Sequence, residues 1–283
     1  MSLISTLRYI ASHPLNRGRS IPAIGRFARW QVESRVRAEV EFEWIEGAKL
    51  IVKHGMTGAT GNIYCGLHEF VEMAFLLHLL RPTDLFLDIG ANIGSYSVLA
   101  SKVCQARSIA FEPDPETAKW LRRNVAGNDL QASAVVHETA LGARNGEIAF
   151  TVGLDTTNHV AASADTRVRM VRVQRLDDIP NAANPTLMKL DVEGFEEQVL
   201  LGASRVLASP SLLAVQSELC SPLVEETLES FGFKRFFYDP FKRELTLKTP
   251  GYGVSNTLFI RDVVQVTQRL AQAPLRKVFG KEI

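Results

Sequence analysis

The chain has 283 residues, of which 46% are apolar and 22% charged, and its 32 basic and 31 acidic side chains leave a net charge of +1. This composition excludes a disordered or fibrous chain and is sufficient for one large core. The near-neutral charge disfavours a nucleic-acid binder, which needs a basic surface for phosphates. The three cysteines are far apart and form no CxxC pair, so we expect no disulfide framework, no thiolate zinc site and a cytoplasmic location.

Residues 1–40 are strongly basic, with seven arginines against Glu33 and Glu39. Apolar residues such as Ile21 and Trp30 recur there at a spacing that predicts an amphipathic helix. Two interpretations stay open. The helix either packs on the main domain with a solvated basic face, or it contacts an anionic substrate or the inner face of a membrane as a peripheral patch. No apolar run approaches the roughly 20 residues that span a bilayer.

The next segments predict a hairpin over 40–45 and 49–53, a glycine-rich stretch over 55–66, and a helix over 68–80. Strands and helices then alternate, which predicts an α/β fold with a mostly parallel sheet and helices on both faces. The last two strands have no helix between them, so we expect an antiparallel hairpin around an excursion over 239–255. The predicted strands are 85–89, 108–111, 133–137, 147–152, 168–173, 186–191, 212–218, 234–238 and 256–261. The predicted helices are 95–103, 115–125, one ending near Leu207, and 223–231.

The segment Asp88–Gly94, Asp-x-Gly-x-x-x-Gly, lies at the first turn from strand to helix. Its glycines let the backbone approach a ligand, and the helix behind it offers N–H groups. Asp88 at the strand end disfavours a pyrophosphate and suits a ligand with an amino group. Glu112 ends the next strand, where an acid accepts hydrogen bonds from ribose hydroxyls. A ribose together with an amino-acid zwitterion indicates S-adenosylmethionine.

Longer segments resemble the FkbM family of S-adenosylmethionine-dependent methyltransferases, over residues 65–262. They are Phe86–Ser97, Phe111–Pro115 with Leu121–Asn124, Ala140–Gly142 with Asn145–Glu147, Leu176–Asp178, and Met188–Ala203. The resemblance implies a Rossmann-like class I methyltransferase domain with a seven-stranded sheet, and O-methylation, often of sugars in glycolipids, polysaccharides or natural products. Residues 1–64 then form a basic helical and hairpin extension, and 263–283 form a tail.

The expected cofactor site combines this resemblance with the strand ends. Glu69, at the start of the helix before the first strand, either contacts the methionine end or complements the helix dipole. Glu138 and Thr139 follow the third strand, where we expect the adenine edge. The complete predicted set is Glu69, Asp88, Gly90, Ala91, Asn92, Gly94, Ser95, Tyr96, Glu112, Pro113, Glu138, Thr139, Ala140 and Asp191.

Methyl transfer to an alcohol also needs a group that removes the hydroxyl proton. Asp191 and Glu193 follow a buried strand and are candidates to act as this base, to bind a sugar hydroxyl, or to hold a divalent ion with Glu218. We assign no metal. His159, in a polar insertion, is a third candidate base, and Asn158 is a candidate to bind the substrate.

The sequence therefore predicts an O-methyltransferase for a carbohydrate-type acceptor. An RNA or protein methyltransferase is one rival, which the near-neutral charge and the lack of an Asn/Asp-Pro-Pro-Tyr/Phe motif disfavour. The other rival is a non-catalytic scaffold that binds the cofactor and presents its basic N-terminus to a membrane complex.

Overall fold

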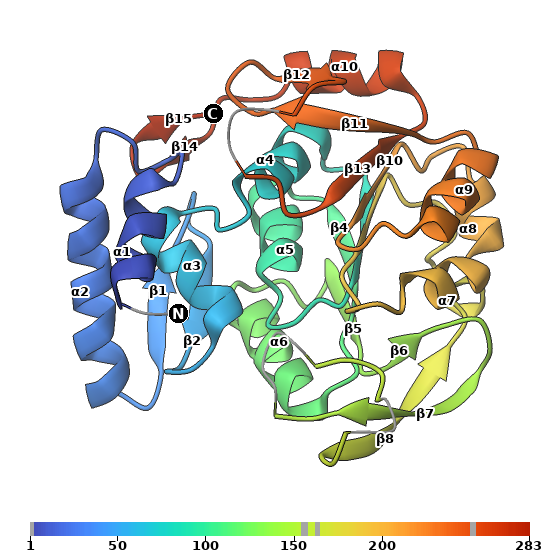
Figure 1. Cartoon of the computed structure of the whole chain (residues 1–283), viewed down its shortest axis with the longest axis horizontal. Helices are drawn as coiled ribbons and strands as arrows, with labels where there is room; N and C mark the ends of the chain where they lie inside the picture. The colour runs from blue at the N-terminus through green and yellow to red at the C-terminus, as the bar shows by residue number, and fades with distance from the viewer. Residues whose placement is uncertain (1–2, 154–157, 162–164, 250–252) are drawn as a thin grey trace.

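The computed structural model describes residues 3–153, 158–161, 165–249 and 253–283 (Figure 1). Its centre is a mixed eight-stranded sheet. In spatial order the strands are β12 (Glu244–Thr246), β11 (Lys234–Asp239), β13 (Thr257–Ile260), β10 (Ala214–Ser217), β9 (Leu187–Leu190), β3 (Leu85–Ile89), β4 (Arg107–Phe111) and β5 (Ala134–His137). Neighbours from β10 to β5 pair in parallel, whereas β11, β12 and β13 pair antiparallel.

The predicted parallel sheet with a closing antiparallel hairpin is confirmed. Strands β11 and β13 pair through Phe236 and Leu258, and β13 also lies antiparallel to β10. The eighth strand, β12, was not predicted. It lies within the excursion over 239–255 and pairs with β11 through Phe237 and Thr246, so part of that excursion extends the sheet edge.

Each buried strand serves two cores because successive side chains point to opposite faces. Phe86 and Ala110 pack on one face, and Leu87 and Ile109 on the other. The helices of the first face are α4 (Phe70–Leu79), α5 (Ser95–Val98) with its π-helical continuation η1 (Leu99–Val103), and α6 (Pro115–Gly127). Those of the second face are α7 (Glu196–Leu201), α8 (Ser204–Ala208) and α9 (Pro222–Ser230).

The helix predicted to end near Leu207 is broken in two at Gly202. A Cβ atom at Gly202 would lie 2.1 Å from the backbone oxygen of Gly142, so only glycine allows this contact. The contact holds α7 and α8 against a small second sheet. That sheet has the order β6-β8-β7, formed by β6 (Ala140–Leu141), β8 (Val168–Gln174) and β7 (Gly146–Thr151). The strands predicted over 147–152 and 168–173 therefore exist, but they lie outside the main sheet.

The N-terminal segment folds as helices and a hairpin beside the main sheet (Figure 1). Its elements are α1 (Leu3–Ser12), α2 (Ser20–Val36), β1 (Val40–Glu43), β2 (Lys49–Val52) and α3 (Thr57–Cys65). The hairpin was predicted, but the basic segment forms two helices rather than one. They are separated by a turn in which Gly18 has a φ of +79°. Most of the glycine-rich stretch is also helical, and Gly61 within it packs where a Cβ would lie 2.2 Å from the His68 ring.

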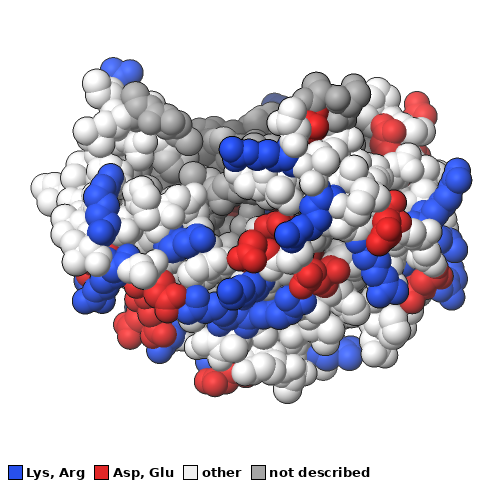
Figure 2. Space-filling model, turned by 90° about the horizontal axis from the view of Figure 1, so that it is seen from below, with Lys and Arg blue, Asp and Glu red and all other residues white. Residues whose placement is uncertain are grey.

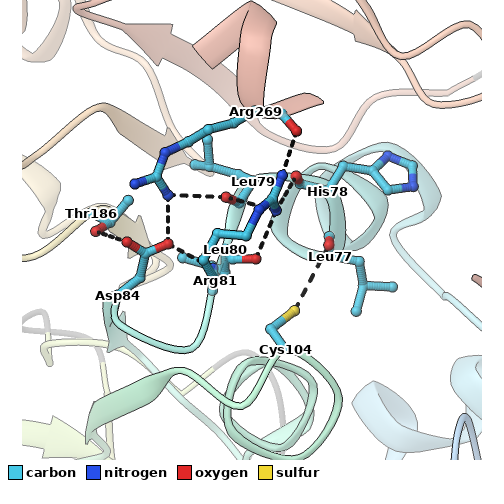
Figure 3. Close-up of polar contacts among 9 residues, drawn as sticks. All are labelled: Leu77, His78, Leu79, Leu80, Arg81, Asp84, Cys104, Thr186 and Arg269. Carbon is cyan, nitrogen blue, oxygen red and sulfur yellow. Dashed lines mark hydrogen bonds and ion pairs between the residues drawn. The ribbon is translucent and has the colours of Figure 1, made fainter. Parts of the chain in front are cut away.

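The C-terminal segment, α10 (Val263–Ala271) with the small hairpin β14 (Lys277–Val278) and β15 (Lys281–Glu282), packs on α4 and on the N-terminal segment. Figure 3 shows the main junction. The Arg269 guanidinium lies 2.6 Å from the buried Asp84 carboxylate, which also accepts from the Thr186 hydroxyl at 3.0 Å. Arg81 donates to the terminal carbonyls of α4 and to the Arg269 carbonyl. These bonds close the C-terminal end of α4, the helix whose N-cap residue is Glu69.

Candidate functional site

A cavity of about 960 Å³ lies at the carboxyl ends of β3, β4, β9 and β10, which we call the strand edge. Open parallel sheets bind ligands at this edge. The opposite side of the cavity is formed by α1, α2 and α3. Most of the predicted site residues line it: Glu69, Asp88, Gly90, Ala91, Asn92, Ser95, Tyr96, Glu112, Pro113, Thr139, Ala140, Asn158, Asp191, Glu193 and Glu218.

The backbone N–H groups of the glycine turn after β3 are hydrogen-bonded within the protein. The five successive amides from Gly90 to Gly94 all donate to oxygen atoms of the protein. Gly90 has a φ of +80°, and a Cβ there would lie 1.7 Å from the backbone oxygen of Asp191. The turn is therefore locked against the end of β9. It presents no cluster of free N–H groups of the kind that binds a phosphate.

Glu112 ends β4 and is buried behind this turn. Its two carboxylate oxygens accept from the backbone N–H of Asn92 at 3.0 Å and of Asp114 at 2.9 Å. Burial raises the pKa of Glu112 to about 8, although the two amide donors oppose the shift. Since each carboxylate oxygen has two lone pairs, both oxygens keep one acceptor position beyond these bonds. This fits the predicted role of Glu112 as acceptor for a pair of ribose hydroxyls.

Asp88 and Glu69 mark the other side of the turn. The Asp88 carboxylate accepts from the Ser97 hydroxyl at 2.6 Å, and burial raises its pKa to about 6 against the attraction of the Lys189 ammonium. Glu69 accepts from the Tyr96 hydroxyl at 2.5 Å. The Lys189 ammonium lies 4.6 Å from the centre of the Tyr96 ring. The carboxylates of Asp88 on β3 and of Glu69 before α4 therefore both lie near the buried Lys189 ammonium at the strand edge.

Asp191, Glu193 and Glu218 form an acid cluster after β9 and β10, with one oxygen of each within 4.8 Å of the others. Burial acts to raise the pKa of Asp191, but the paired Lys189 ammonium outweighs it and lowers the pKa. Burial, together with a hydrogen bond to Asp191, raises the pKa of Glu218 to about 9. At neutral pH the cluster therefore holds a charged Asp191 beside a protonated Glu218.

Glu193 differs from the other two acids in its backbone. Its φ is +51°, and the following Gly194 also has a positive φ of +97°. A left-handed conformation in a residue other than glycine costs free energy and is concentrated at functional sites. Burial, followed by the charges of Asp191 and Glu196, raises the pKa of Glu193. The backbone therefore holds a carboxylate of increased basicity at the cavity wall.

The acid cluster does not resemble a divalent-cation site in its charge. Lys189 already neutralises Asp191, and Glu218 carries a proton. A hard divalent ion needs ionised oxygen ligands, so binding would have to displace both partners. The chemistry of these donors suits hydrogen bonding to a hydroxyl better than metal coordination.

Three predicted residues do not line the cavity. Glu138 forms an ion pair with Arg122 at 2.8 Å, with both side chains partly exposed. His159 lies 3.3 Å from the Asp165 carboxylate, although its neighbour Asn158 does reach the cavity. Gly94 supports the turn through its backbone, with a φ of +89°. The predicted roles of Glu138 at the adenine edge, of His159 as base or substrate contact and of Gly94 in cofactor binding stay predictions.

Lys189 is fully buried in β9 and was not among the predicted site residues. The available signal was a lysine inside an otherwise apolar strand, because a buried charge needs a partner. Asp191 is two residues away, on the same face. A second set of cavity residues from α1 and α2 was also missed. This helical wall consists of Leu3, Thr6, Tyr9, Phe27, Gln31 and Arg35.

The sheet order, the glycine turn and the acids at the ends of β3 and β4 define a Rossmann-like class I methyltransferase fold. The family model described as the Methyltransferase FkbM domain matches residues 88–243, more than half of the chain. The chain belongs to this family, as the sequence resemblance implied.

Several proteins that resemble the chain are named as methyltransferases. Hexuronic acid methyltransferase AglP of Haloferax volcanii is 26% identical over 144 residues, 50% of this chain and 59% of that protein. Methyltransferase 1 of Beauveria bassiana is 30% identical over 148 residues, 43% of this chain and 59% of that protein. These matches span less than two thirds of either relative. The crystal structure of methyltransferase FkbM from Methylobacillus flagellatus KT shares 18% identity with a TM-score of 0.45, covering 64% of this chain and 44% of that one.

The cofactor of this family is S-adenosylmethionine, and the donor set of the strand edge fits it. The wall that contains Asp88 and Glu112 is rich in carboxylate acceptors, and the glycine turn offers no phosphate-binding amides. Such a surface suits a ligand with ribose hydroxyls, an ammonium group and a sulfonium, all of which are donors or cations.

Proposed function

We propose that this chain is an S-adenosylmethionine-dependent O-methyltransferase that acts on a hydroxyl group of a sugar or glycosylated acceptor. The observation that carries the proposal is the Glu193 carboxylate, held by a left-handed backbone in an acid cluster beside the glycine turn. Glu112 would hold the ribose, and Asp88 with Glu69 the methionine end.

The cofactor, when bound, supplies a methyl group on a sulfonium that an oxygen nucleophile can accept. Glu193 then accepts the hydroxyl proton of the acceptor, for which its raised pKa is better suited than that of an ordinary carboxylate. Asp191 stays charged on Lys189 and accepts a hydrogen bond that orients the hydroxyl. The proton can leave to solvent afterwards, because Glu193 is only half-buried.

A carbohydrate acceptor is supported by the name of one relative, which specifies a hexuronic acid. The cavity also offers aromatic faces and several hydrogen-bonding groups, including Tyr9, Tyr64 and Thr60, as a sugar ring with many hydroxyls requires. An RNA acceptor is less well supported. Figure 2 shows both basic and acidic side chains on the lower face, and the net charge of the chain is only +1, whereas binding to phosphates favours a strongly basic chain.

Two measurements test this proposal. Calorimetry should show binding of S-adenosylhomocysteine, and tritiated methyl groups should pass to members of a panel of nucleotide-sugars, glycolipids and polysaccharides. Methyl transfer only to RNA or protein fractions would show that the acceptor is an RNA or a protein instead of a carbohydrate. Binding of the cofactor product without transfer to any fraction would favour the non-catalytic scaffold, and no binding would overturn the proposal entirely.

We further propose that α2 contacts an anionic membrane surface. Ile21, Ala28, Val32 and Val36 form an apolar stripe on the solvent face of α2, the α2 stripe, opposite the buried Trp30. Ile21 is 85% exposed and Val36 80%. Exposed arginines of residues 1–40, such as Arg8, Arg17 and Arg37, supply the charge for anionic headgroups. None of the described helices is both long and apolar enough to cross a membrane.

A further inference from the structure

The helical wall comes from residues that precede the family-matched segment. Leu3, Thr6 and Tyr9 are spaced three apart on α1, and Phe27, Gln31 and Arg35 are spaced four apart on α2. Such spacings place side chains in one row along a helix. Each row faces the cavity from the side opposite the strand edge. One end of the cavity is thus built by the fold of the family, and the other by the N-terminal extension.

Arg35 is held in this row by its neighbours. Its Nη1 donates to the Gln31 side-chain oxygen at 2.7 Å and to the Gln31 backbone oxygen at 2.5 Å. The Gln31 amide donates in turn to the Tyr64 hydroxyl at 3.2 Å. Both Arg35 bonds use Nη1 and, among the described residues, no acid pairs with this guanidinium. Nη2 and Nε therefore keep their donors for a ligand.

The charges along the cavity are separated. Arg35 and Lys189 are the only Lys or Arg side chains among the described residues that line it, and Lys189 is neutralised by Asp191. All the acids that line it lie at or beside the strand edge: Glu69, Asp88, Glu112, Asp191, Glu193 and Glu218. An anionic group is repelled from that end and attracted to the helical wall. The cavity can therefore orient an acceptor that carries a negative charge.

We propose that Arg35 binds an anionic group, a carboxylate or a phosphate, on the acceptor, and thereby directs the acceptor hydroxyl toward Glu193. The inference rests on the proposed function and names its substrate class, an acidic sugar or a sugar phosphate. A guanidinium matches the geometry of both oxyanions through paired N–H bonds. The tyrosine and phenylalanine rings of the wall then cover the apolar face of the sugar ring.

The test is calorimetry in the presence of saturating S-adenosylhomocysteine, with three probes. 4-Nitrophenyl glucuronide carries a carboxylate, UDP-glucose carries phosphates, and 4-nitrophenyl glucoside is neutral. We expect one anionic probe to bind wild type at least about tenfold more tightly than the neutral glucoside, and Arg35→Ala to remove that difference, since a hydrogen bond to a charged group contributes about this much. The probe that responds identifies a carboxylate or a phosphate as the group bound.

Arg29→Ala is the matched control, because Arg29 lies on the same helix but pairs with Glu33 and does not line the cavity. It should bind the probes like wild type. Equal binding of anionic and neutral probes to wild type, no binding of either anionic probe, or an unchanged preference in Arg35→Ala each overturns the inference. S-adenosylhomocysteine binding is measured beforehand, in a separate titration of each protein without any probe. If wild type does not bind S-adenosylhomocysteine, the proposed function is contradicted. Failure of the proposed function is thereby distinguishable from failure of the Arg35 inference.

Discussion

The strand edge and the helical wall enclose the same cavity but are built in opposite ways. At the strand edge, Asp88 is 1% exposed and Glu112 7%, and each carboxylate is fixed by hydrogen bonds to the turn or to the helix behind it. At the helical wall, Arg35 is exposed and is held only by a glutamine four residues before it. The carboxylates of the first surface are buried and hydrogen-bonded, whereas the arginine of the second is exposed and has one neighbouring residue as its partner.

This difference follows from how the two surfaces fold. Strand ends are positioned by the whole sheet, so the position of a side chain there is fixed by the packed core. Side chains on the added helices are positioned by how those helices pack on α3 and on each other, and not by the strands of the sheet. We infer that the strand edge serves the cofactor and the chemistry, while the helical wall selects the acceptor. Substitutions on the two surfaces should therefore have separable effects.

Replacement of the proposed base has the largest expected effect. Glu193→Gln keeps the size of the side chain but cannot accept the hydroxyl proton, so kcat should fall about 10²–10⁴-fold while the affinity for S-adenosylmethionine is retained. Single-turnover methyl transfer and calorimetry measure the two quantities separately. Glu226→Gln, an exposed change on α9, is the control. An unchanged kcat in Glu193→Gln would remove this residue from the mechanism.

Replacement of the carboxylates proposed to bind the cofactor should change the affinity for S-adenosylmethionine, which Glu193→Gln retains. Asp88→Ala and Glu112→Ala each remove a hydrogen-bond acceptor at the strand edge, and we expect S-adenosylmethionine affinity to fall about tenfold to a hundredfold or more. The control is Glu116→Ala, an exposed acid in the first turn of α6. Calorimetry on folded protein, verified by circular dichroism, measures the change. Undiminished affinity in both variants would mean that the cofactor lies elsewhere.

The acid cluster also predicts how stability depends on pH. The pKa of Glu218 is raised to about 9 in the folded protein, far above the roughly 4.3 of an unfolded chain. The folded state therefore binds this proton more tightly. The stability it contributes is fully present below the unfolded value and is lost as pH rises through about 9. Glu112, with a pKa raised to about 8, acts in the same direction.

Glu218→Gln lacks this titration, so its free energy of unfolding should fall less steeply than that of wild type between about pH 5 and pH 9. Urea denaturation across this range measures both slopes. Glu112 is retained in both proteins, so a residual slope is expected in the variant. Parallel curves for the two proteins would show that Glu218 does not carry a proton in the folded state at neutral pH.

The strand edge was largely predictable from the sequence and the helical wall was not. Asp88, Glu112 and Asp191 each follow a run of apolar residues, and parallel strands bring their carboxyl ends together whatever the surrounding sequence. The rows on α1 and α2 have no such constraint. Their position depends on how α2 docks on α3 and α1 on α2, which are contacts between helices that no periodicity reveals.

Two details show where local patterns are insufficient. Lys189 looked like a member of a conventional buried strand, and only its contact with Asp191 reveals its part in setting the charge of the site. Glu138 follows β5 as an adenine-edge residue would, yet its side chain turns outward to Arg122. Both outcomes depend on the direction of a side chain relative to distant elements, which spacing along the chain does not determine.

The smallest expected effect concerns the α2 stripe. The double substitution Ile21→Glu/Val32→Glu places charges on its solvent face and should weaken binding to phosphatidylglycerol-containing vesicles by about tenfold at most, because these side chains are only partly buried at a headgroup layer. Val264→Glu is the matched control, since Val264 is 69% exposed on α10. Vesicle co-sedimentation measures binding, and added salt should weaken it. Two results would contradict the membrane proposal: wild type that does not bind anionic vesicles, or a double variant that binds them as wild type does. The N-terminal helices would then serve only the acceptor side of the cavity.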